Sequence, residues 1–140
     1  MTIRGVRGAT VAAENTVHAI LAATRELLQA MLQGNPGLET SDIGSAFFTV
    51  TEDLDATYPA LAARSIGWTQ VPMLCAREIP VPDGMPRVIR VLLHWNTDRS
   101  QAEIYHAFLY EAAQLRPDLA TVEENDRALS SIPSRDSQFS

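Results

Sequence analysis

The stretch RVIRVLLHW, residues 87–95, has the composition of a strand at the centre of a sheet. Its apolar side chains are β-branched or large, and alternation separates Ile89 and Val91 from Arg90, which shares its face with Leu92. Burying an unpaired guanidinium is costly, so the stretch predicts an anion beside Arg90. That anion is either a carboxylate, in a structural ion pair or at a subunit contact, or a ligand bound in a dry pocket. The strand itself leaves these alternatives open.

The segments around this strand follow an α+β pattern, in which a mixed β-sheet packs against one long helix and several short ones. The long helix begins at Asn15 or Thr16, carries an apolar stripe at helical spacing, and ends near Gly34. A shorter helix is expected between Pro59 and Gly67. The expected strands, the last of them ambiguous with a helix, span residues 3–11, 46–54, 68–81, 87–96 and 104–115.

Length and composition fit one compact domain. The chain has 140 residues, of which 46% are hydrophobic and 20% charged. We expect the folded domain to span residues 1–120 and the polar residues 121–140 to form a frayed C-terminal tail. The net charge of −6 argues against a general binder of nucleic acid or of an anionic membrane, because both need a basic surface.

Cysteine content and the apolar runs of the sequence indicate a compartment. Cys75 is the only cysteine, which excludes an internal disulfide and fits a reducing environment. No run has the character of a signal peptide or reaches the roughly 20 apolar residues of a membrane span. We therefore expect a soluble, cytoplasmic protein.

Two side chains of the 68–81 strand are candidates for chemistry. Glu78 shares a face with Leu74 and Ala76, so it is either the partner of an arginine or a hydrogen-bond acceptor or general base. Cys75 lies on the opposite face, where a lone cysteine is most often a small buried hydrophobe. A nucleophilic pair of Cys75 with a histidine has no local signature here. One cysteine and three scattered histidines predict no metal site.

Five segments, taken in order, resemble one known family. They are IRGVRGAT (3–10), TEDLDATYPALAAR (51–64), GWTQVPMLCARE (67–78), RVIRVLLHWNT (87–97) and LRPDL (115–119). Together they resemble the monofunctional AroH-type chorismate mutases of the Bacillus-like class. The resemblance implies a small α+β subunit that assembles as a homotrimeric pseudo-barrel with active sites between subunits. It also implies an isomerase without cofactor or metal, which rearranges chorismate to prephenate on the route to phenylalanine and tyrosine.

The same resemblance implies the site residues. By motif, the catalytic residues are Arg7, Glu78 and Arg90. The implied substrate-binding residues are Met73, Leu74, Cys75, Ala76 and Arg77 on one strand, Tyr58, Ala60, Leu61 and Arg64 from the neighbouring subunit, and Phe108, Leu115 and Arg116 at the rim of the cleft. The chain departs from the family pattern in two places, with Phe108 where the family has a tyrosine and Leu61 where a lysine is common.

The implied chemistry answers the question raised by Arg90. A dicarboxylate substrate needs local cations even in an acidic protein. In the implied roles, Arg90 stabilises negative charge on the breaking ether oxygen, Arg7 clamps a carboxylate, Glu78 accepts from the ring hydroxyl, and Cys75 is a weakly polar wall.

Two other functions use the same residues. One is a non-catalytic trimeric binding module for a small carboxylate, and the other is a hydrolase built on Cys75. An acid beside a cationic pocket favours the mutase, because a pure anion binder gains little from Glu78.

Overall fold

The computed structural model describes residues 2–120, 122–133 and 135. The strands are β1 (Thr2–Val11), β2 (Ile43–Val50), β3 (Met73–Arg77), β4 (Val88–Thr97) and β5 (Ala107–Phe108). The helices are α1 (Val17–Gln33), α2 (Ala60–Ser65) and α3 (Val122–Ser130), with the 3-10 turns η1 (Thr40–Asp42), η2 (Gln101–Glu103) and η3 (Tyr110–Gln114). The expected mixed α+β architecture is confirmed for the described residues.

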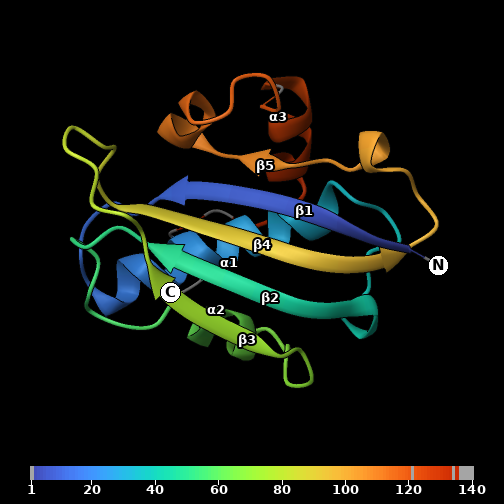
Figure 1. Cartoon of the computed structure of the whole chain (residues 1–140), viewed down its shortest axis with the longest axis horizontal. Helices are drawn as coiled ribbons and strands as arrows, with labels where there is room; N and C mark the ends of the chain where they lie inside the picture. The colour runs from blue at the N-terminus through green and yellow to red at the C-terminus, as the bar shows by residue number, and fades with distance from the viewer. Residues whose placement is uncertain (1, 121, 134, 136–140) are drawn as a thin grey trace.

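The five strands form one mixed sheet in the order β3-β2-β4-β1-β5. β4 is antiparallel to both of its neighbours, whereas β3 is parallel to β2 and β5 is parallel to β1. The strand predicted to be central is therefore in the middle of the sheet (Figure 1). In the same view α1 and α2 lie behind the sheet, and α3 lies at the edge of the sheet that β5 forms.

α1 covers one face of the sheet. Thr16 caps its start, because the Thr16 hydroxyl accepts from the Ala19 amide at 3.1 Å. Leu27 and Met31 have no exposed surface and face the sheet. Gly8 on β1 permits this close packing, since a Cβ there would lie 2.5 Å from the Met31 sulfur. The helix therefore packs closely against β1 at Gly8.

The opposite face of the sheet is covered by no α-helix of the described residues, and we call it the open face. Register and alternation place on it Arg7, Phe47, Thr49, Leu74, Ala76, Arg90, Leu92 and His94. One row runs from Leu74 through Phe47 and Leu92 to Arg7, and the adjacent row runs from Ala76 through Thr49 to Arg90. The expected alternation along β4 is confirmed, because Ile89, Val91 and Leu93 are buried against the helices.

Two strands are shorter or shifted relative to the sequence prediction. β2 starts at Ile43 and ends at Val50, because the chain turns at Thr51, whose carbonyl accepts from the Leu54 amide at 3.0 Å. β3 covers only Met73–Arg77 of the expected 68–81, since Pro72 and Pro80 flank it and cannot donate to a ladder. The ambiguous segment 104–115 contains both the strand β5 and the turn η3.

The C-terminal segment differs from the frayed tail that was expected. Residues 122–130 form α3, and Asn125 and Ala128 are buried on it. The Asn125 amide donates to the Phe108 carbonyl at 2.7 Å, and the Tyr105 hydroxyl donates to the Asn125 side chain. The polar composition hid this helix, because its few apolar contacts, at Ala128 and Leu129, are joined by buried polar contacts of Asn125. Residues 121, 134 and 136–140 of the predicted tail lie outside the described residues.

Among the described residues, no helix combines the length and apolar character needed to cross a bilayer.

Candidate active site

The structure brings the three predicted catalytic residues together on the open face. Arg7 comes from β1, Arg90 from β4, and Glu78 follows the last residue of β3. They line a cavity of about 300 Å³, whose walls are completed by Phe47, Thr49, Val91 and Leu92. Residues far apart in sequence therefore meet because four adjacent strands each present a side chain to the same face.

Glu78 supplies a carboxylate beside Arg90, one of the two kinds of anion that the strand left open. The Arg90 Nε lies 3.3 Å from the Glu78 Oε2, and the Thr49 hydroxyl donates to the same oxygen. The Arg90 Nε itself is buried and makes no hydrogen bond of good geometry. The two side chains are 38% and 22% exposed, so Arg90 is not enclosed in a core as its apolar neighbours suggested. The ion pair borders a cavity, where a ligand can reach both groups.

Arg7 faces Arg90 across this cavity. Its guanidinium carbon lies 5.6 Å from the centre of the Phe108 ring, which is fully buried beneath it. Burial is the main cause that lowers the pKa of Arg7; Arg90 and then Arg116 lower it further, while Glu78 opposes them. Three arginine charges therefore act on one another here, and the cavity is a local cationic site in an acidic protein.

The predicted rim residues lie beside Arg7. Arg116 makes a bidentate pair with Asp118, with its Nε and Nη2 at 3.0 and 2.9 Å from the two carboxylate oxygens. Asp118 is the main cause that raises the pKa of Arg116. Leu115 packs against the cluster that contains Phe108. The guanidinium of Arg116 is exposed and held in a fixed orientation by its neighbour.

The side chains of β3 divide between the two faces. Leu74 and Ala76 point to the open face, whereas Met73 and Cys75 pack against the helix-covered core. Arg77 is exposed. Burial raises the pKa of the Cys75 thiol, and this outweighs the opposing effects of the Ala60 backbone and Arg64. The thiol is thus directed away from the cavity and is held in its poorly nucleophilic, protonated form.

The residues expected from a neighbouring subunit do not line the cavity within one chain. Tyr58, Ala60, Leu61 and Arg64 lie on α2 and just before it. Tyr58 is 70% exposed and Leu61 is 40% exposed. α2 lies behind the sheet in Figure 1, on the side opposite to the open face.

Sequence reasoning named as site residues none of the four that complete the cavity wall, Phe47, Thr49, Val91 and Leu92. Thr49 orients Glu78, and Phe47 forms part of the apolar floor. Both alternate with Phe48, which is fully buried. The signal that could have found them was the period-two pattern of β2, read together with its pairing to β4.

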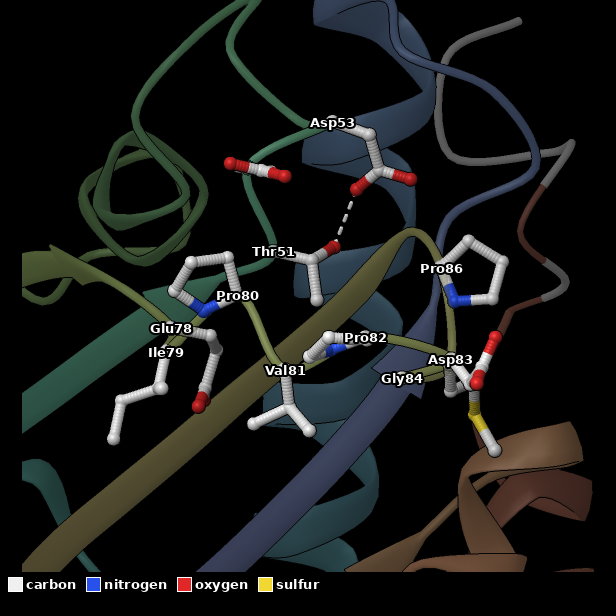
Figure 2. A pocket seen from close by; sticks show the side chains of 12 residues that line it. Thr51, Asp53, Glu78, Ile79, Pro80, Val81, Pro82, Asp83, Gly84 and Pro86 are labelled. Atoms are coloured by element: carbon white, nitrogen blue, oxygen red, sulfur yellow. Dashed lines mark hydrogen bonds between the residues drawn. The ribbon is translucent and has the colours of Figure 1, made fainter.

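A second cavity of about 330 Å³ adjoins the first beneath the connection between β3 and β4. Figure 2 shows Glu78 and Ile79 at one end of it and Asp83, Gly84 and Pro86 at the other. Asp53 closes its upper side, where its carboxylate accepts from Thr51 and from the Arg87 amide. Glu78 borders both cavities, so this connection forms one wall of the site.

Comparison with known proteins supports the resemblance seen in the sequence. Residues 3–119 match the family model described as chorismate mutase type I. The chain is 51% identical over 121 residues to the chorismate mutase AroH of Thermus thermophilus, covering 86% of this chain and 99% of that protein. It is 36% identical over 127 residues to the chorismate mutase AroH of Bacillus subtilis, covering 90% and 99%.

A solved structure agrees as well. A chorismate mutase from Clostridium thermocellum superposes with a TM-score of 0.76 at 46% identity, covering 79% of this chain and 97% of that one. The sheet and its arginine-lined cavity thus belong to an enzyme of the isomerase class. The chain belongs to the chorismate mutase type I family.

Proposed function

We propose that chorismate binds in the cavity of Arg7, Glu78 and Arg90 and rearranges there to prephenate, as expected of a chorismate mutase. One observation carries this proposal. The guanidinium groups of Arg7 and Arg90 both lie near the Glu78 carboxylate, on a sheet face that no α-helix of the described chain covers. A dianion with a hydroxyl needs this combination of cations and one acceptor.

The rearrangement needs no nucleophile, no proton transfer, no metal and no cofactor, because one C–O bond breaks while one C–C bond forms within the same molecule. The site acts by holding the substrate in its reactive chair. It also stabilises the negative charge that grows on the ether oxygen. The Arg90 side chain is 38% exposed at the cavity, so its guanidinium can reach that oxygen. Arg7 then clamps a carboxylate, and Glu78 accepts from the ring hydroxyl.

We further propose the homotrimer with sites between subunits that the family resemblance implies, and the exposed residues of the open face support an interface there. Phe47 and Leu74 form part of an apolar row on the open face and are 39% and 66% exposed. Large exposed apolar side chains in one patch mark an interaction surface. A second copy placed on this face would bury them. It would also supply Tyr58, Ala60, Leu61 and Arg64 to a cavity that lacks them within one chain.

A cytoplasmic location is part of the proposal, since a free thiol at Cys75 suits a reducing compartment. The binding-module alternative is not favoured, because the relatives named above are all chorismate mutases. The hydrolase alternative is disfavoured by the direction and the raised pKa of the Cys75 thiol.

The test is an assay of chorismate consumption with detection of prephenate, with no metal or cofactor added. Prephenate formation is expected, and its absence in folded protein would contradict the proposal. The interface is tested by mixing Arg90→Ala and Arg64→Ala subunits, each expected to be inactive alone. Partial recovery on mixing is expected, because each shared site draws the two arginines from different chains. An active monomer in sedimentation would contradict the shared site.

A further inference from the structure

The outer edge of β1 is closed mainly by side chains. β5 contributes only two residues, which pair with Gly8 and Ala9. Further towards the start of β1, the Gln101 amide takes the place of a strand at Gly5, donating to its carbonyl at 2.7 Å and accepting from its amide at 3.0 Å. Between these two places, the Arg7 amide donates to the His106 Nδ1 at 2.9 Å. The backbone of Arg7 is thus fixed on this edge by one imidazole.

This hydrogen bond defines the state of the histidine ring. A backbone amide can only donate, so the Nδ1 must offer a lone pair, and the ring proton resides on Nε2. Protonation of the ring would turn Nδ1 into a donor that faces the N–H of Arg7. The contact would then be lost, and the edge of β1 would be repelled at the residue that carries the site guanidinium.

We propose that His106 is a positioning residue for Arg7, whose neutral Nδ1 holds the β1 backbone where the Arg7 guanidinium reaches the cavity. This inference rests on the proposed role of Arg7 in binding chorismate. His106 does not line the cavity and acts only through Arg7. It therefore differs from the residues that touch the reacting atoms.

The surroundings of His106 favour the neutral ring. The charged groups that face it are Arg7 from β1, Arg116 from the segment after η3, and Glu124 from α3. Burial is the largest cause that lowers the pKa of His106 below 6.5, the two arginines lower it further, and Glu124 opposes them. The neutral acceptor is therefore present throughout the neutral and alkaline range.

The pH dependence follows from the direction of this shift. Because the folded protein resists protonating His106, the contribution of the contact to stability is complete above about pH 6.5 and is lost as the pH falls below it. The positioning of Arg7 is lost at the still lower pKa of the folded state. We expect an acid limb in kcat/KM that lies below pH 6.5 and coincides with the titration of the His106 ring observed by NMR.

Two substitutions distinguish the role of His106 as a hydrogen-bond acceptor from the effect of protonating its ring. In His106→Asn the side-chain oxygen takes the place of Nδ1 and cannot be protonated in this range, whereas His106→Leu removes the acceptor. His106→Asn is expected to keep kcat/KM within about twofold at pH 8 and to lose the acid limb. His106→Leu is expected to lower kcat/KM at pH 8 about three- to tenfold, mainly through KM, and to lack the acid limb, since both the hydrogen bond and the titrating group are lost.

Matched controls are the exposed His18 on α1 and Gln101, which closes the same edge at Gly5. His18→Asn and Gln101→Leu are expected to retain the acid limb. An acid limb that persists unchanged in His106→Asn would overturn the inference, as would a His106→Leu enzyme with unaltered kcat/KM.

A further variant distinguishes this inference from the role proposed for Arg7. If Arg7→Ala leaves kcat/KM unchanged, the proposed site is wrong and the positioning inference is wrong with it. If Arg7→Ala is strongly impaired but His106→Leu is not, only the positioning inference is wrong. In an Arg7→Ala background, adding His106→Leu is expected to cost less than twofold more, because both changes act through the same guanidinium.

Discussion

The two faces of the sheet differ in how far their side chains are buried within one chain. On the helix-covered face, Val6, Phe48, Val91 and Leu93 are buried, and α1 packs over them. On the open face the same strands present Arg7, Thr49 and Arg90, which remain partly exposed. One face is complete within a single chain. The other carries charged groups and an apolar row that stay partly exposed in a single chain.

The difference shows that one sheet can carry the residues that stabilise the fold on one face and the residues of the candidate active site on the other. Alternation lets a strand place a core residue and a site residue next to each other in sequence, as Arg90 and Val91 do on β4. Substitutions on the helix-covered face should therefore act on folding, and substitutions on the open face should act on catalysis or assembly.

Leu27→Ala should affect folding most. Leu27 has no exposed surface and packs between α1 and the sheet, so its truncation leaves a cavity. We expect a loss of about 2–5 kcal/mol in the free energy of unfolding. Val17→Ala, on the same helix but with Val17 50% exposed, should change it by less than about 0.5 kcal/mol. Urea unfolding measures both, and equal losses would contradict the assignment of faces.

Arg90→Ala should impair catalysis and leave folding nearly unchanged. We expect kcat to fall by at least about 10²–10³-fold, the effect of removing a preorganised donor to a developing oxyanion, with little change in unfolding free energy. Arg90→Lys should also be poor, because lysine lacks the planar guanidinium fork.

The matched control for Arg90 is Arg4→Ala on β1, since the Arg4 Nε donates to the Arg99 carbonyl and does not line the cavity. Steady-state kinetics of the three variants are compared with wild type. An Arg90→Lys enzyme with nearly full kcat would mean that the point charge alone suffices.

Much of the helix-covered face could be predicted from the sequence, because the patterns that specify it lie within short stretches of the chain. The α1 stripe, the Thr16 cap and the central strand follow from period and propensity. Pro72 and Pro80 limit β3 to a shorter strand than the predicted 68–81. α3 was missed because Asn125 stabilises it through buried polar contacts to residues distant in sequence.

The open face was predicted less fully because its contacts are made across strands. Arg7, Glu78 and Arg90 were recognised from their motifs, but their meeting depends on the strand order β3-β2-β4-β1, which no local pattern specifies. Thr49 and His106 were missed for the same reason, since each acts on a residue at least 29 positions away. The partners of Tyr58, Leu61 and Arg64 depend on a second chain and stay a prediction.

Phe108→Tyr tests a position that faces the site from beneath Arg7. The ring is fully buried and its packing is already supplied by phenylalanine, so a restored hydroxyl adds at most one ordinary hydrogen bond. We expect substrate affinity to improve by no more than about tenfold, the factor that 1.4 kcal/mol allows, with kcat nearly unchanged. A large rise in kcat would mean that the hydroxyl acts in the transition state.

Cys75→Ser should have the smallest effect on catalysis, and it tests the boundary between the two faces. Cys75 lies on β3 between Leu74 and Ala76 of the open face, yet its side chain packs against the core. Its thiol has a raised pKa, so at neutral pH little thiolate is available for a nucleophilic role.

A serine at position 75 keeps a weak donor of similar size but is more polar, so it should cost about 1 kcal/mol or less in folding and leave kcat/KM within about threefold. The pH profile of the variant between pH 7 and 9 should match that of wild type, because no thiol ionises in the mechanism. Loss of activity in a folded Cys75→Ser protein, together with the disappearance of an alkaline limb, would place the thiol in the chemistry. The helix-covered face would then have a catalytic role that its packing does not suggest.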